Sequence, residues 1–167
     1  MTAEEITKYL TELNDELRLM EIKGEVSLYG GAVMCLAFKA RPATKDVEAI
    51  FEPVREIRNA ACRVGDKHNL DVGWLNLAVK IFLVEHVKTL MFDFPNLKVY
   101  VPEGEYMLAM KVLSARADSS DLEDIRFLLN HLKVRNVNEV IRVVRNYYPK
   151  KEVKETTIFL LEELLEP

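Results

Sequence analysis

Two adjacent glycines and two closely spaced carboxylates are the residues of this sequence whose types and order suit chemistry. Gly30-Gly31 follows an apolar stretch with the character of a short strand, and a run of helix-forming residues comes next. Such glycines let a ligand approach the backbone and leave main-chain N–H groups open at the positive end of a helix dipole. The pair therefore predicts a phosphate-binding turn.

Asp46 and Glu48 follow on the next segment, separated only by Val47. On a strand this spacing points both side chains to the same face. Neighbouring carboxylates repel unless a cation lies between them, and Mg²⁺ is usually held by one or two carboxylates together with substrate phosphates. We therefore expect Asp46 and Glu48 to be metal ligands and catalytic residues in a metal-assisted in-line displacement. Each motif alone also fits a plain turn or a solvated strand edge, and their joint order favours the functional interpretation.

The segments that must position these residues alternate between strands and helices. We expect strands over 25–29, 44–50 and 97–101, and helices over 3–20, 32–38, 52–67, 105–116, 121–133, 137–147 and 152–165. Thr2 and Glu5 form a capping box for the first helix, and Ser120 is the expected N-cap of the helix that begins at Asp121. Residues 68–77 fit a loop or a short turn of helix, and periodicity does not choose between helix and strand for 78–84.

This order of elements predicts an α/β (or α+β) fold with a mixed sheet flanked by helices and a helical C-terminal half. No repeat, low-complexity tract or linker divides the sequence. We therefore expect a single domain over 1–167, with a core at about 25–116 and C-terminal helices over 117–167.

The composition favours a soluble cytoplasmic protein. Its 167 residues are 49% hydrophobic and 30% charged, with a formal net charge of -4, so the chain as a whole has no attraction for nucleic acid or an anionic membrane. The N-terminus lacks the features of a signal peptide, and no apolar run approaches the ~18 residues of a membrane span. Cys35 and Cys62 are expected to be buried free thiols.

One local region departs from the acidic balance. Near the C-terminus, basic residues outnumber acidic ones, namely Arg135, Arg142, Arg145, Lys150, Lys151 and Lys154. Two interpretations stay open: a solvated helix face, or a patch that contacts RNA or a partner protein.

The residues around the two motifs resemble a known family. Gly30-Gly31-Ala32-Val33-Met34-Cys35-Leu36, together with Arg41-Pro42-Ala43-Thr44-Lys45-Asp46-Val47-Glu48, is similar to the AbiEii-like branch of the nucleotidyltransferase-fold superfamily. The later Trp74-Leu75-Asn76 also resembles this branch, as do Lys111, Arg116 and the pair Asp121 and Asp124. The likeness runs from about residue 25 to 132 and implies a nucleotidyltransferase-like sheet.

This resemblance implies roles for individual residues. Gly30 and Gly31 would hold nucleotide phosphates, Asp46 and Glu48 would bind Mg²⁺, and Lys111 would contact a phosphate as a point charge. Arg41, Thr44 and Lys45 stand where they reach the triphosphate or brace the loop, with bracing or solvation favoured for Thr44 and Lys45. Trp74 fits a packing anchor better than a base-stacking platform.

Two departures from the family pattern bear on activity. The second acid is Glu48, where Asp is more usual. Active relatives also use a third carboxylate from a later strand, but 97–101 has no acid and Leu77 stands where some relatives carry one. Asp71 and Asp93 are the nearest alternatives, so the general base is unassigned.

Two functions are therefore expected from the sequence. The first is Mg²⁺-dependent transfer of a nucleoside monophosphate from an NTP to RNA or a protein acceptor. The alternative is a catalytically degenerate member of the fold that acts as an interaction protein, such as a toxin–antitoxin or phage-defence partner. The sequence leaves the acceptor, the base preference and the oligomeric state open.

Overall fold

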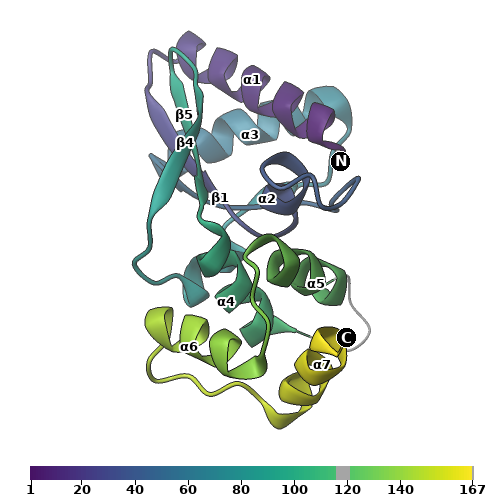
Figure 1. Cartoon of the computed structure of the whole chain (residues 1–167). Coiled ribbons are helices and arrows are strands. Elements are labelled where there is room, and N and C mark those ends of the chain that lie inside the picture. The colour runs from purple at the N-terminus through teal and green to yellow at the C-terminus, as the bar shows by residue number, and fades with distance from the viewer. Residues whose placement is uncertain (116–120, 167) are drawn as a thin grey trace. The chain divides into compact units, whose positions relative to one another are not determined.

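The computed structural model describes residues 1–115 and 121–166, which gather into two compact units (Figure 1). The first unit comprises Met1–Leu83 and Lys88–Pro102, and the second comprises Val84–Val87 and the residues from Glu103 onward. The boundary between the two units falls at Glu103. The helix expected over 105–116, at the end of the predicted core, therefore belongs to the second unit. Arg116 and the expected N-cap Ser120 lie outside the described residues.

The first unit is built on a five-stranded mixed sheet, which confirms the α/β class. Its strands are β1 (Gly24–Leu28), β2 (Val47–Glu52), β3 (Leu75–Asn76), β4 (Lys88–Asp93) and β5 (Leu97–Pro102). They lie in the order β3-β2-β1-β5-β4. β1 is antiparallel to β2 and parallel to β5, β3 is parallel to β2, and β4 is antiparallel to β5.

Three α-helices and a short 3-10 helix complete this unit: α1 (Ala3–Leu19), α2 (Gly30–Leu36), α3 (Val54–His68) and η1 (Ala78–Phe82). α1 and α3 pack side by side, and both also contact the sheet (Figure 1). Buried and exposed side chains alternate along β2, which shows the face of the sheet that these helices cover. Val47, Ala49 and Phe51 on one face are buried, while Glu48 and its neighbours on the other face are more exposed. The carboxylate of Glu48 therefore belongs to the face opposite the core.

The capping box expected at the first helix is present. The backbone N–H of Glu5 donates to Thr2 Oγ1 at 3.2 Å, and the Thr2 N–H donates to Glu5 Oε2 at 2.8 Å. The apolar face of α1 is buried, including Ile6, Leu10 and Leu13. These local signals fix where α1 begins and which side of it faces the core.

The second unit contains the described helices α4 (Gly104–Ser114), α5 (Asp121–His131), α6 (Val137–Tyr147) and α7 (Glu155–Leu165). α4 packs against both α5 and α6, and α6 packs against α7. The helical C-terminal half is thus confirmed. Within the described residues, no helix is both long enough and apolar enough to cross a bilayer.

Several expectations from the sequence are wrong in detail. β4 and the two-residue β3 were not expected. For residues 78–84, where helix and strand were both open, the structure has a 3-10 helix over Ala78–Phe82. β4 lacks the alternation of buried and exposed residues that predicts a strand. It is a largely exposed edge strand, and its register shifts between Leu90 and Phe92. Cys35 is buried, but Cys62 is exposed, because α3 turns Ala60, Ala61 and Val64 toward the core instead.

A carboxylate of α1 ties that helix to α3. Glu12 accepts hydrogen bonds from His68 Nε2 at 2.8 Å and from Lys67 Nζ at 3.0 Å. Burial acts to raise the pKa of Glu12, but the hydrogen bonds from His68 and Lys67 outweigh it, and the pKa lies below its ordinary value. The folded state therefore gains stability from the ionised form of Glu12.

We expect Glu12→Gln to lower the free energy of unfolding by about 1 kcal/mol at neutral pH. Because the folded pKa is depressed, this contribution is present above the unfolded pKa and is lost as the pH falls through the folded value. Urea melts of both proteins from neutral to acidic pH should therefore converge at the acidic end. Glu16→Gln is the control, since its partner Arg63 is largely exposed and its loss should be smaller. A difference between the two proteins that persists below the folded pKa of Glu12 would contradict this account.

Candidate functional site

The glycine pair lies at the junction of β1 and α2. β1 ends at Leu28, Tyr29 is the extended N-cap residue, and α2 begins at Gly30. Gly30 has a φ of 59°, in the left-handed region where a Cβ is unfavourable. The strand–glycine–helix order expected from the sequence is therefore confirmed, with the helix starting at the first glycine.

The structure brings the second motif directly over the first. A Cβ on Gly30 would overlap the carboxylate oxygen Oε2 of Glu48 and would lie 3.2 Å from its Cδ. A Cβ on Gly31 would overlap the Thr44 hydroxyl and would lie 3.1 Å from Arg41 Nη1. Side chains from β2 and from the loop before it thus lie directly against both glycines, and Gly30 also has a backbone conformation that favours glycine. The carboxylate of Glu48 lies beside the first turn of α2, where the helix dipole favours an anion.

Asp46 immediately precedes β2 and is held by a residue of β3. The Nδ2 of Asn76 donates to Asp46 Oδ2 at 3.0 Å. Asn76 is the register partner of Glu48 in the parallel β2–β3 pair, so the two side chains share a face of the sheet. Asn76 therefore donates to Asp46 and is the register partner of Glu48, although Asp46 lies just outside the strand on which it was expected.

The loop before Asp46 is braced by the N-terminal segment. The N–H of Thr44 donates to the Met1 carbonyl at 2.9 Å, and the Met1 amine donates to the Thr44 carbonyl at 2.6 Å. The Thr44 hydroxyl donates to the Asp46 carbonyl at 3.2 Å. These bonds give Thr44 the bracing role, while its hydroxyl also faces Gly31. Lys45 is exposed.

Lys111 belongs to α4 in the second unit. Its ammonium lies 2.7 Å from Asp121 Oδ1 and 2.9 Å from Asp124 Oδ2, both on α5. Asp124 is only 2% exposed, so this is a largely buried ionic group that joins α4 to α5. The Asp pair of the family pattern thus serves as the partner of Lys111.

The position next to the two acids carries an amide. Asn76 occupies it, whereas Asp93 ends β4 at the opposite end of the sheet, where β5 begins. Within residues 1–115 and 121–166, no three His, Cys, Asp or Glu side chains gather as a metal-binding group. Sequence reasoning named Trp74-Leu75-Asn76 only as a family likeness. Its register against Asp46 and Glu48 follows from the parallel pairing of β2 with β3.

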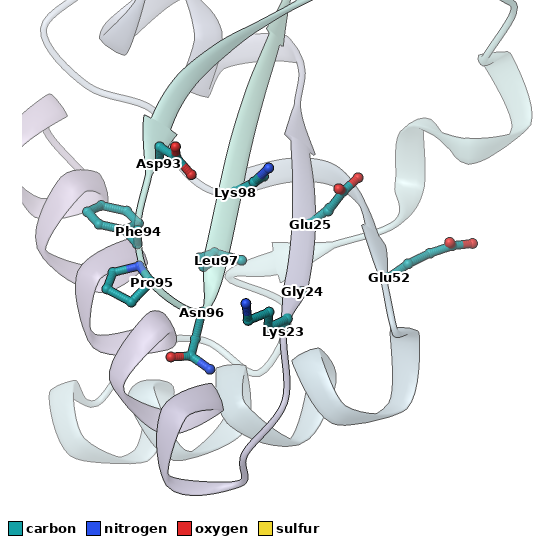
Figure 2. A pocket seen from close by; sticks show the side chains of 10 residues that line it. All are labelled: Lys23, Gly24, Glu25, Glu52, Asp93, Phe94, Pro95, Asn96, Leu97 and Lys98. Carbon is teal, nitrogen blue, oxygen red and sulfur yellow. The ribbon is translucent and has the colours of Figure 1, made fainter.

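A pocket of about 560 Å³ lies elsewhere in the first unit (Figure 2). Its lining comes from the starts of β1 and β5 and the ends of β2 and β4, namely Lys23, Gly24, Glu25, Glu52, Asp93, Phe94, Pro95, Asn96, Leu97 and Lys98. Lys98 is the register partner of both Glu25 and Asp93, which places opposite charges side by side across the strands. β1 runs from this pocket toward Gly30, so the pocket and the glycine–carboxylate site lie at opposite ends of the sheet.

Comparison with known proteins adds no assignment. No family model, no curated protein and no solved structure matches the chain.

Proposed function

We propose that the first unit binds a nucleoside triphosphate with Mg²⁺ and transfers its nucleoside monophosphate to an acceptor, either RNA or a protein. One observation carries the proposal: Glu48 lies against Gly30, and Asn76 joins Asp46 to the same sheet face. A turn that suits phosphate and a pair of carboxylates that suits a cation are thus neighbours in space as well as in sequence order.

The donor set fits Mg²⁺. Asp46 and Glu48 would hold it through hard carboxylate oxygens, and the remaining positions would go to water and phosphate oxygens. When bound, the ion neutralises charge that develops on the transferring phosphoryl group. The backbone at Gly30 and Gly31 orients the phosphates, and Asn76 fixes the carboxylate of Asp46 through its amide N–H. Arg41 and Thr44, whose side chains lie against Gly31, would contact the triphosphate at this turn.

Calorimetric titration with Mg²⁺ and each NTP in turn tests this function. The wild-type chain should bind at least one NTP, and Asp46→Asn should weaken that affinity at least tenfold, about 1.4 kcal/mol, because a charged ligand of the cation is lost. Glu48→Gln should act in the same direction. The matched control is Glu25→Gln/Glu52→Gln, which removes another neighbouring pair of carboxylates from the opposite end of the same sheet.

Three outcomes would contradict the proposal. The first is the absence of binding heat for every NTP with the wild-type chain. The second is an affinity of Asp46→Asn equal to that of the wild-type chain. The third is a loss of affinity in the control variant equal to that in Asp46→Asn, which would attribute the binding to the general negative charge of the sheet.

A second candidate function is favoured by the amide of Asn76. It takes the place beside Asp46 and Glu48 where a third carboxylate would serve as general base, which suits a degenerate member of the fold. Such a chain acts as an interaction protein, for example in a toxin–antitoxin or phage-defence pair. Co-purification of a stoichiometric partner, together with no transfer of labelled nucleotide to RNA or protein, would favour this candidate.

A further inference from the structure

The second unit carries a strong local excess of positive charge. Residues 133–154, here called the basic segment, hold seven cationic side chains and two acidic ones, a net charge of +5. The whole chain has a net charge of -4, so the remaining residues together carry -9. Charge is therefore segregated along the chain, and the basic segment is the part that attracts anions.

The cationic side chains of the basic segment are exposed to solvent. α6 forms the middle of the basic segment, and it buries Val140, Val143 and Val144 within the second unit. Arg142 and Arg145 lie on the opposite side of the helix, one turn apart, and both are exposed. Arg135 precedes the helix, and exposed lysines follow it, namely Lys150, Lys151 and Lys154.

These cations are not neutralised by the protein. In the described part of the chain, none of the seven has an acidic side chain within ion-pair distance. Glu139, the one acid within α6, instead caps its helix by accepting from the Arg135 backbone N–H and the Asn136 side chain, each at 2.9 Å. The guanidinium groups of Arg142 and Arg145 therefore present their full set of donors to solvent.

We propose that the basic segment binds the phosphate backbone of a nucleic acid strand. α6 is about 16 Å long, and a strand carries one phosphate per about 3.4 Å, so the helix can face four to five phosphates. The planar guanidinium matches phosphate geometry, and lysines add point charges. The proposal goes beyond the nucleotide site of the first unit and does not depend on Asp46 or Glu48.

Two other anionic partners fit the observations less well. A membrane-surface helix needs a free apolar face, whereas the apolar face of α6 is buried against its own unit. Protein interfaces are depleted in lysine, which makes up four of the seven cations here. A regular row of phosphates is therefore the anion that this surface fits best.

Fluorescence anisotropy of the full-length chain with labelled oligouridine of about 20 nucleotides tests the proposal. Non-specific binding should show a Kd of about 1–100 µM, and log K should fall against log salt with a slope of about -3 for four phosphates. Arg142→Gln/Arg145→Gln should reduce that slope by about 1.4 units and weaken binding about 25-fold at ~0.1 M salt. Oligothymidine should bind similarly, because the backbone is the recognised feature.

The control variant removes two arginines from another exposed helix face. Arg55→Gln/Arg58→Gln on α3 should leave the affinity and the slope unchanged. Lys150→Gln/Lys151→Gln, outside any helix, should weaken binding without touching α6, and circular dichroism should show that each variant is folded.

Three results would overturn the proposal. The first is no anisotropy change with either oligonucleotide, and the second is an equal loss of affinity in the α3 control. The third is tighter binding to phosphatidylserine vesicles or to polyglutamate than to oligouridine at the same salt, which would assign the surface to a membrane or to an acidic protein.

Discussion

Lys111→Met is expected to lower the free energy of unfolding of the second unit by about 3–5 kcal/mol. The substitution keeps most of the side-chain volume but removes the ammonium that contacts both Asp121 and Asp124. Lys111 and Asp124 are almost completely buried, so water cannot replace the lost partner. The cost is therefore that of removing the cation beside the buried carboxylate of Asp124 and the half-buried carboxylate of Asp121.

Urea denaturation followed by two probes would measure this loss. Trp74 is the single tryptophan and lies in the first unit, so its fluorescence reports that unit, while far-UV circular dichroism reports both. The circular dichroism transition should shift to lower urea. Lys133→Met, at an exposed lysine of the same unit, is the matched control and should change stability by less than about 0.5 kcal/mol.

The same variant also separates the two roles considered for Lys111. If the ionic group is purely structural, Lys111→Met/Asp121→Asn/Asp124→Asn should recover much of the lost stability, because all three charges of the group are removed together. If Lys111 contacts a nucleotide phosphate, Lys111→Met should weaken NTP binding while the unfolding transition stays where it was. An unchanged transition would contradict the structural role.

Local sequence signals predicted those elements whose bounds depend on interactions between residues close together in the chain. The capping box of Thr2 and Glu5 predicted the start of α1, and the helix predicted over 137–147 matches α6 at both ends. The order of β1, the glycine pair and α2 was also predicted from the residue types along this segment. In each case the deciding interactions span only a few residues.

What the sequence did not predict depends on pairing between distant segments. Asn76 meets Asp46 because β3 joins β2 in parallel, a contact that no helical or strand period encodes. Glu48 meets Gly30 because the second strand returns antiparallel beside the first. Likewise, the local sequence does not predict that Lys111 is buried. Its two aspartate partners come to it only through the packing of α5 on α4.

The candidate site depends on the side chain of Trp74, which immediately precedes β3. Trp74 is 3% exposed, its Nε1 donates to the Ala61 carbonyl at 2.9 Å, and the Tyr9 ring meets it edge-on at 5.7 Å. A Cβ on Gly65 would lie 3.3 Å from Trp74 Cδ1, so the ring packs closely on the backbone of α3. The Trp74 carbonyl accepts the Val47 N–H at 2.6 Å, which ties β3 to the start of β2.

Trp74→Ala is therefore expected to lower the free energy of unfolding by about 3–5 kcal/mol, because it leaves a large cavity against α3. Trp74→Phe should cost less, since much of the ring volume stays and only the indole hydrogen bond is lost, about 1 kcal/mol. Urea melts followed by circular dichroism measure both. A loss below about 1 kcal/mol in Trp74→Ala would contradict the packing role and reopen a base-stacking one. If the melts agree with the packing role, Trp74→Phe should also keep its NTP affinity, because β3 still holds Asn76 beside Asp46.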